Sequence, residues 1–120
     1  MLAAVDLARV VEAARDCGAA ILGGPVVDTL KEVVETRVAR DVSRSRLYHA
    51  ETPQVFRRDL LASAHRQNPQ DLAATDDSGL VQQIDEPVMV VVSECPNIKV
   101  TTPADLELAE AYLRHLYPAT

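Results

Sequence analysis

Apolar positions recur along the chain at two spacings, one typical of helices and one of strands. Over residues 6–16 they fall three and four positions apart, which predicts an amphipathic helix ended by Gly18. The short apolar run at 19–22 predicts a buried strand. The β-branched run VMVVV at 88–92 is typical of a strand buried on both faces of a sheet.

The middle of the chain predicts two further helices. The first follows Thr52-Pro53 and gives way to a polar loop at 65–71; its apolar positions are Phe56, Leu60, Leu61 and Ala64. Thr75 is suited to cap a second, shorter helix, in which Asp76 and Asp77 occupy the first turn, where acidic groups favour the helix dipole.

Residues 26–43, VVDTLKEVVETRVARDVS, combine helical and strand features. Their valines and threonines favour an extended arm or hairpin, which we place at about 26–50. The alternation of helices and strands elsewhere predicts one layered α/β domain over residues 1–120, with parallel strands.

The start of the last helix is well marked in the stretch NIKVTTPADLELAE at 97–110. Thr102 is suited to the N-cap, Pro103 to the first helical position, and Asp105 to the acidic position of a capping box. The following apolar residues recur at helical spacing and predict a buried face: Leu106, Ala109, Leu113 and Leu116.

Lys99 precedes this helix between two apolar residues. The segment 98–100 is short and β-branched and is expected to be a strand end. A lysine there would lie at the carboxyl end of a strand beside a helix N-terminus, where open α/β sheets bind ligands. The alternative is a solvent-facing lysine on an edge strand.

Composition indicates an ordinary soluble protein, with 48% hydrophobic and 25% charged residues. Neither a membrane span nor a secretory leader is indicated. Cys17 and Cys95 form no metal or redox motif and are expected to be reduced thiols, so the cytoplasm is the expected location.

Charge is distributed unevenly. The net charge of −6 argues against a nucleic-acid binder, yet residues 37–58 hold six arginines and two acidic residues, a local charge of +4 against −10 elsewhere. Such a cluster suggests recognition of a small anion, phosphate above all, because guanidinium offers a bidentate fork. A solvated arm or a subunit contact would explain it equally well.

Several catalytic motifs are missing from the sequence. The four glycines form neither a Walker A loop nor a G-x-G-x-x-G turn, there is no G-x-S-x-G elbow, and the histidine spacing fits no usual zinc site. Cations and hydroxyl groups near element ends remain: the arginine cluster, Lys99, Thr29, Thr52 and Thr75. Cations and hydroxyls without a nucleophile or base suggest a site for a phosphorylated, hydroxyl-bearing ligand.

Four sequence blocks resemble the second half of 2-C-methyl-D-erythritol 4-phosphate cytidylyltransferase, in order and approximate spacing. They are PVVDTLKEV at 25–33, VSRSRLYHAETPQVFRRDLL at 42–61, TDDSGLV at 75–81 and NIKVTTPADLELAEAYL at 97–113. The resemblance implies part of a three-layer, Rossmann-like nucleotidyltransferase fold with a projecting β-arm that forms a homodimer. It also implies the joining of CTP to methylerythritol phosphate, with magnesium and release of pyrophosphate.

The resemblance also assigns roles to the remaining cations and hydroxyls. Lys99 matches the lysine that positions the substrate phosphate, and Arg44 matches an arginine that contacts the same phosphate from the neighbouring subunit's arm. Threonines that line the sugar-phosphate pocket correspond to Thr29, Thr52 and Thr75. In this reaction the substrate phosphate approaches the α-phosphate of CTP, and both groups are anionic. Catalysis therefore rests on positioning and charge neutralisation.

The match also has departures. The family's glycine-rich nucleotide loop and the aspartate that serves magnesium have no counterpart in these 120 residues, so we expect a substrate-side half that alone lacks CTP binding and activity. Ser43 and Arg46 stand where the family commonly has an acid and a small residue. The alternatives are a non-catalytic dimerisation or regulatory module derived from the family and an unrelated phosphosugar-binding domain.

Overall fold

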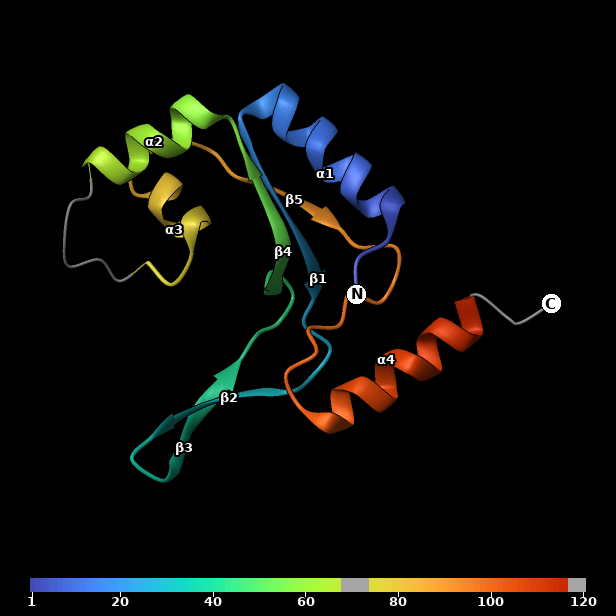
Figure 1. Cartoon of the computed structure of the whole chain (residues 1–120). Helices are drawn as coiled ribbons and strands as arrows, with labels where there is room; N and C mark the ends of the chain where they lie inside the picture. Colours follow the sequence, from blue (N-terminus) through green and yellow to red (C-terminus); the bar gives the residue numbers. More distant parts are fainter. Residues whose placement is uncertain (68–73, 117–120) are drawn as a thin grey trace.

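A three-stranded sheet with helices on both faces forms the centre of the computed structural model, which describes residues 1–67 and 74–116 (Figure 1). Strand β1 lies in the middle of this sheet, antiparallel to β4 and parallel to β5, while β2 and β3 form a separate hairpin. The elements follow in the order α1 (Ala4–Cys17), β1 (Ala19–Pro25), β2 (Leu30–Val34), β3 (Arg37–Val42), β4 (Tyr48–Phe56), α2 (Arg58–Gln67), α3 (Asp77–Gln82), β5 (Met89–Val92) and α4 (Pro103–Leu116).

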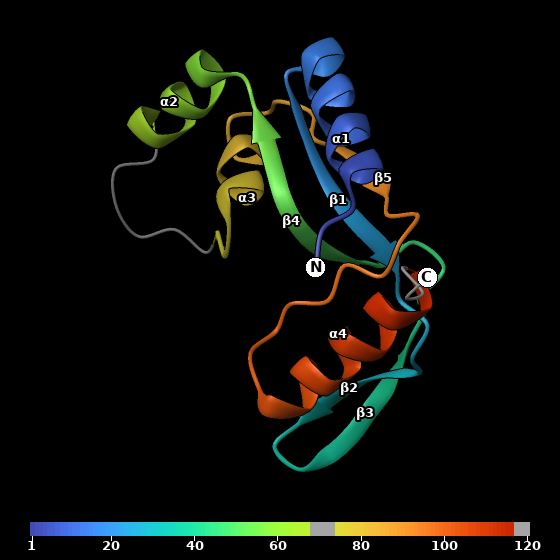
Figure 2. The ribbon, with the colours of Figure 1, turned by 45° about the vertical axis from the view of Figure 1, so that its right-hand side comes forward.

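The core is built on the two faces of β1. Because successive side chains of a strand point to opposite faces, β1 contributes to two apolar clusters. One contains Val10 and Ala14 of α1 with Ala20 and Leu22 of β1. The other joins Ala19 of β1 to α2 and α3 through Leu60, Ala64 and Val81. The sheet therefore lies between two helical layers, as the resemblance implied (Figure 2).

The predictions for the first helix and the first strand are confirmed, and the arm contains a hairpin as predicted, but residues 48–50 of the predicted span 26–50 pair with β1 as part of β4. Gly18 ends α1 in the left-handed conformation, with φ of 95°, and its N–H donates to the carbonyl of Ala14. Such a φ favours glycine because no Cβ clashes with the backbone. The arm is the β2–β3 hairpin, which projects away from the sheet (Figure 1).

The helix predicted directly after Thr52-Pro53 was placed too early, and strand β4 was missed. Tyr48–Phe56 pairs with β1 from Pro25↔Tyr48 to Ala19↔Phe56, and α2 begins only at Arg58. Thr52 and Pro53 fall at a shift in register and have no Cα partner in β1. Proline is tolerated at such a bulge on an edge strand because no ladder N–H is required there.

The expectation that residues 88–92 are buried on both faces was wrong. In β5 the residues Met89, Val90 and Val92 are 50%, 45% and 44% exposed. Within the described part of the chain, β5 pairs only with β1, so one edge and much of its surface lack cover. Among the strands described, the prediction of parallel strands holds only for β1 and β5, because β1 and β4 run antiparallel.

The N-terminus of α4 was predicted correctly, but its surroundings were not. Thr102 Oγ1 accepts from the Asp105 N–H at 3.2 Å, and the Asp105 carboxylate accepts from the Thr102 N–H at 2.8 Å, which makes the capping box. Helix α4 lies apart from the sheet (Figures 1 and 2), and of its apolar face only Ala109 is buried. The three leucines of that face are 40–53% exposed: Leu106, Leu113 and Leu116.

Three smaller expectations also need correction. Residues 98–100 form no strand and pair with none of the strands described. The cap of α3 is Asp76 rather than Thr75, because the Asp76 carboxylate accepts from the N–H of Gly79 at 2.9 Å. Of the polar loop predicted at 65–71, residues 65–67 belong to α2 and 68–71 lie outside the described residues.

Candidate substrate site

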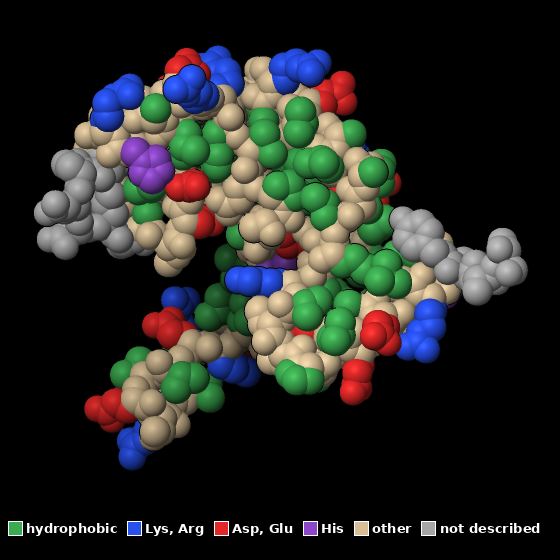
Figure 3. Space-filling model, in the orientation of Figure 1, with side chains coloured by type: hydrophobic (Ala, Val, Ile, Leu, Met, Phe, Trp, Pro, Cys, Tyr) green, Lys and Arg blue, Asp and Glu red, His purple; other side chains and the backbone are tan. Residues whose placement is uncertain are grey.

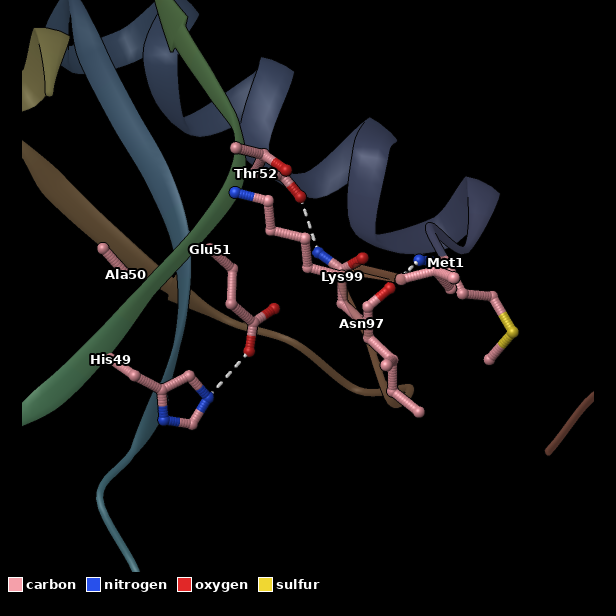
Figure 4. Close-up of a pocket in the computed structure, with 9 residues that line it drawn as sticks. Met1, His49, Ala50, Glu51, Thr52, Asn97 and Lys99 are labelled. Carbon is pink, nitrogen blue, oxygen red and sulfur yellow. Dashed lines mark hydrogen bonds and ion pairs between the residues drawn. The ribbon is translucent and has the colours of Figure 1, made fainter. Parts of the chain in front are cut away.

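A cavity of about 560 Å³ lies where β4 meets the loop that follows β5. Its walls are residues 49–52 of β4 and residues 97–100 of that loop, together with Met1 (Figure 4). The space-filling view shows a deep notch at the same level, between the helical body above and the arm and α4 below (Figure 3). The cavity is large enough for a small phosphorylated metabolite.

Lys99 supplies a cation to this cavity. It lies in the loop between the end of β5 and the start of α4, not at the strand end that was expected, and its side chain extends along β4 toward Thr52 (Figure 4). Within the described part of the chain, its ammonium group has no hydrogen bond or ion pair, and the residue is exposed. An ammonium group without a protein counter-ion can accept an anionic ligand with no internal pair to break.

The loop around Lys99 is fixed on both sides. The side-chain amide of Asn97 donates to the backbone carbonyl of Thr52 at 2.5 Å. Beyond Lys99, the Asp105 carboxylate accepts from the N–H and hydroxyl groups of Thr101 at 3.0 and 2.9 Å. These hydrogen bonds hold the pKa of Asp105 at about 2, with the Thr101 N–H as the largest cause.

A second cavity of about 570 Å³ lies on the other side of Thr52 and contains Thr75. Gln54 joins its walls, because its amide donates to Asp76 Oδ2 at 2.7 Å and its carbonyl accepts from the Ser78 N–H at 3.2 Å. The hydrogen bond from Gln54 is the largest cause that lowers the pKa of Asp76, ahead of the one from the Gly79 N–H. The start of α3 is thereby tied to β4.

The predicted site residues fall into two groups. Lys99, Thr52 and Thr75 line the two neighbouring cavities, with Thr52 shared by both. Thr29 and Arg44 line neither cavity. Thr29 precedes the first strand of the arm and Arg44 follows the second, and both are exposed.

Only part of the arginine cluster is available to an external anion. Arg40 is paired with Glu32 across the arm, and Arg57 is paired with Asp59 at 3.5 Å. The remaining arginines of the cluster have no ion pair within the described part of the chain: Arg37, Arg44, Arg46 and Arg58.

Sequence reasoning missed a polar group on the cavity wall. The Glu51 carboxylate accepts from the Ser93 hydroxyl at 2.6 Å and pairs with His49 Nε2 at 3.0 Å. Its side chain is only 13% exposed. His49 and Glu51 are two positions apart, so recognition of β4 as a strand would have placed them on one face.

Two features are absent from the described residues. In the ranges 1–67 and 74–116, no group of three or more histidine, cysteine, aspartate or glutamate side chains could hold a metal ion. Over the same ranges, no helix has the length and apolar character needed to cross a lipid bilayer.

Comparison with solved structures gives the class of the fold. The chain resembles the crystal structure of 2-C-methyl-D-erythritol 4-phosphate cytidylyltransferase from Thermus thermophilus, with a TM-score of 0.83 and 40% identity over 95% of this chain and 57% of that one. The enzyme from Francisella tularensis matches with a TM-score of 0.81 and 26% identity, over 93% of this chain and 54% of that one. The sheet, its helical layers and the arm thus belong to a nucleotidyltransferase fold.

Sequence comparison gives the family. Residues 1–115 match the family described as IspD, 2-C-methyl-D-erythritol 4-phosphate cytidylyltransferase, and the chain belongs to this family. Relatives with that name include those of Salinibacter ruber, 48% identical over 92% of this chain and 47% of the relative, and Pelotomaculum thermopropionicum, 46% identical over 95% and 49%. The chain spans about half the length of the curated relatives it matches.

Proposed function

We propose that the chain is the substrate-side part of a cytidylyltransferase that joins CTP and 2-C-methyl-D-erythritol 4-phosphate to give CDP-methylerythritol and pyrophosphate. Family membership supports this proposal. The observation that carries it is the ammonium group of Lys99, which has no ion pair within the described ranges and lies in a cavity shared with Thr52. That pairing of a cation and a hydroxyl suits a phosphorylated polyol.

The proposed reaction needs positioning more than a protein nucleophile. A phosphate oxygen of methylerythritol phosphate bonds to the α-phosphorus of CTP, while the bond from that phosphorus to the bridging β-phosphate oxygen breaks and pyrophosphate leaves. Lys99 offsets the repulsion between the two anions, and the hydroxyl groups of Thr52 and Thr75 orient the substrate.

The proposal includes a homodimer in the cytoplasm. In that dimer the arm of one subunit would bring Thr29 and Arg44 to the cavity of its partner. Both residues lie at the base of the arm and line neither cavity of their own subunit. Exposed valines support an arm that packs against another subunit: Val33, Val34 and Val38 are 55–62% exposed.

The proposed reaction also uses magnesium and CTP, and these 120 residues are not expected to supply most of the CTP contacts. The resemblance implies the metal, but the described residues offer no cluster of three or more suitable ligands. Both oxygens of Asp76 already accept hydrogen bonds, from Gln54 and from Ser78 and Gly79. No step of the proposed reaction on this chain therefore passes through magnesium.

The exposed arm also favours a second candidate, a dimerisation or regulatory module that associates with a complete cytidylyltransferase through this hairpin. The two functions differ in ligand binding. A module of this kind would associate through the arm but would not depend on Lys99 to bind methylerythritol phosphate.

Calorimetric titration of the chain with methylerythritol phosphate tests the proposal. We expect Lys99→Ala to weaken binding about tenfold or more, because a hydrogen bond to a charged group is worth about 1.5–3 kcal/mol. Arg114→Ala is the matched control, since it removes an exposed cation that is paired with Glu110 outside both cavities. Equal affinities of wild type and Lys99→Ala would contradict the proposal.

A further inference from the structure

A fully buried carboxylate in α1 has no part in the proposed reaction. Asp6 is 0% exposed, although it lies in the first turn of a surface helix. Burial of a carboxylate is costly unless hydrogen bonds or an ion pair compensate. Its partners therefore indicate what the residue does.

Those partners belong to the loop that follows β5. Asp6 Oδ1 accepts from the backbone N–H of Glu94 at 3.0 Å, and Oδ2 accepts from that of Cys95 at 3.3 Å. Two consecutive amides of the loop are thus held by one carboxylate. Arg9 Nη1, one turn along the helix, lies 3.3 Å from Asp6 Oδ1 and compensates its charge.

Arg9 also contacts this region directly. Its guanidinium donates to the backbone carbonyl of Val92 at 3.0 Å and lies 3.1 Å from Glu94 Oε1. Asp6 and Arg9 together therefore contact Val92, the last residue of β5, and Glu94 and Cys95 of the loop that follows it.

The loop leads directly to the candidate site. Two residues beyond Cys95, Asn97 binds the carbonyl of Thr52, and two residues further on is Lys99. Asp6 itself lines neither cavity. Any influence of Asp6 on a ligand is therefore indirect, and the backbone of residues 94–99 connects the two.

We propose that Asp6 is a positioning residue, which fixes the loop after β5 so that Lys99 faces Thr52 across the cavity. This inference rests on the proposed function for its effect on ligand binding. Its effect on the loop does not depend on that function, and the two can be measured separately.

The test compares Asp6→Asn with Val10→Ala in the full chain. In Asp6→Asn one side-chain oxygen can still accept from a loop N–H, but the side-chain amide group faces the other loop N–H, and both of these groups are donors. Val10 is fully buried in the same helix and belongs to the apolar cluster, so Val10→Ala weakens α1 without a contact to the loop. Both variants are studied well below their melting temperatures, so that each remains folded.

The first measurement is the heteronuclear NOE of the backbone amides of Asn97 and Lys99, with no ligand present. We expect these values to fall in Asp6→Asn and to stay at the wild-type level in Val10→Ala. Unchanged values in a folded Asp6→Asn chain would overturn the positioning role, whatever the ligand is.

The second measurement is the affinity for methylerythritol phosphate. We expect the affinity of Asp6→Asn to be about tenfold lower than that of the wild type. The double variant with Lys99→Ala should bind no worse than Lys99→Ala alone, since both changes remove the same contact, that of Lys99 with the ligand. Additive losses would overturn the inference. Absence of binding by the wild type would overturn the proposed function instead, and the loop NOE would still decide the role of Asp6.

Discussion

The side-chain amide of Asn97 donates to the backbone carbonyl of Thr52 and so joins the loop that carries Lys99 to strand β4. Thr52 falls at the register shift of β4, where it has no Cα partner in β1. The irregularity that admits Pro53 thus also leaves a carbonyl available for the loop. Two walls of the cavity are connected at this point.

Loss of this connection should weaken the site. We expect Asn97→Ala to reduce the affinity for methylerythritol phosphate several-fold, because the loop that carries Lys99 loses its hydrogen bond to β4. Asn97→Asp is the matched variant, since it keeps the shape of the side chain and replaces the donor by an acceptor that faces the Thr52 carbonyl. Titration calorimetry should therefore rank wild type above Asn97→Ala and Asn97→Asp last. An affinity of Asn97→Asp equal to that of wild type would refute the role of the contact.

The start of α4 should depend on acid pH. Hydrogen bonds from Thr101 and Thr102 hold the pKa of Asp105 at about 2, below its ordinary value of 3.8. A depressed pKa in the folded state means that the stabilisation is complete above about pH 4 and is lost as the pH falls through about 2. The amide shifts of Thr101 and Thr102, followed from about pH 5 to about pH 1.5, should titrate with that midpoint.

Asp105→Asn should remove this titration, whereas Glu107→Gln, an exposed change in the same helix, should leave it in place. A midpoint near the ordinary value of 3.8 in the wild type would show that the capping contacts do not persist in solution.

Gln54 should control the charge state of Asp76 and the attachment of α3. Removal of its hydrogen bonds in Gln54→Met should raise the pKa of Asp76 toward its ordinary value and lower the free energy of unfolding by about 1–2 kcal/mol. Titration of the Asp76 carboxyl carbon by NMR and urea unfolding provide the measurements.

Gln82→Met provides the control, because Gln82 is exposed on α3 and lines neither cavity. The wild type should lose its Asp76 contribution to stability as the pH falls below about 4, while Gln54→Met should lose less. An equal loss of stability in acid for the wild type and Gln54→Met would argue against control of the Asp76 charge state by Gln54.

Two adjacent glycines in β1 should respond differently to a methyl group. A Cβ on Gly23 would lie 2.9 Å from the backbone oxygen of His49, whereas one on Gly24 would lie 2.7 Å from the Nε2 atom of the His49 ring. A backbone atom of a paired strand cannot move aside, but an exposed ring can. Gly23→Ala should therefore cost about 1–3 kcal/mol of stability, and Gly24→Ala should cost less.

The second substitution should instead displace the His49 ring from Glu51, with which it pairs at 3.0 Å. Urea unfolding compares the stabilities, and the ring shifts of His49 report the displacement. A larger loss of stability for Gly24→Ala would contradict this explanation.

Local sequence signals predicted the features that depend on neighbouring residues. The C-cap at Gly18, the hairpin arm and the capping box of Thr102 and Asp105 all follow from short-range geometry. Strand β4 was missed because its pairing with β1 is non-local and Pro53 suggested a break. The exposure of β5 and α4 could not be predicted, since apolar patterning shows which face of an element is suited to burial and not whether another element covers that face.

The residues of the candidate site were likewise predicted only in part. The chemistry of Lys99, Thr52 and Thr75 was evident from residue type and family resemblance, and their catalytic roles stay predictions. Asp6 and the contact of Glu51 with Ser93 were overlooked because the partners lie far along the sequence, whereas the pairing of Glu51 with His49 was missed together with strand β4.

The central position of β1 has a consequence for the order of events during synthesis. Pairing of β1 with β4 needs the chain only as far as Phe56, whereas pairing with β5 waits for Met89–Val92. The loop that closes the cavity follows β5, so the wall formed by residues 97–100 is added to a β1–β4 ladder that can already exist. A nascent chain therefore acquires its structural frame well before it can hold a ligand, and Lys99 arrives among the last parts of the site.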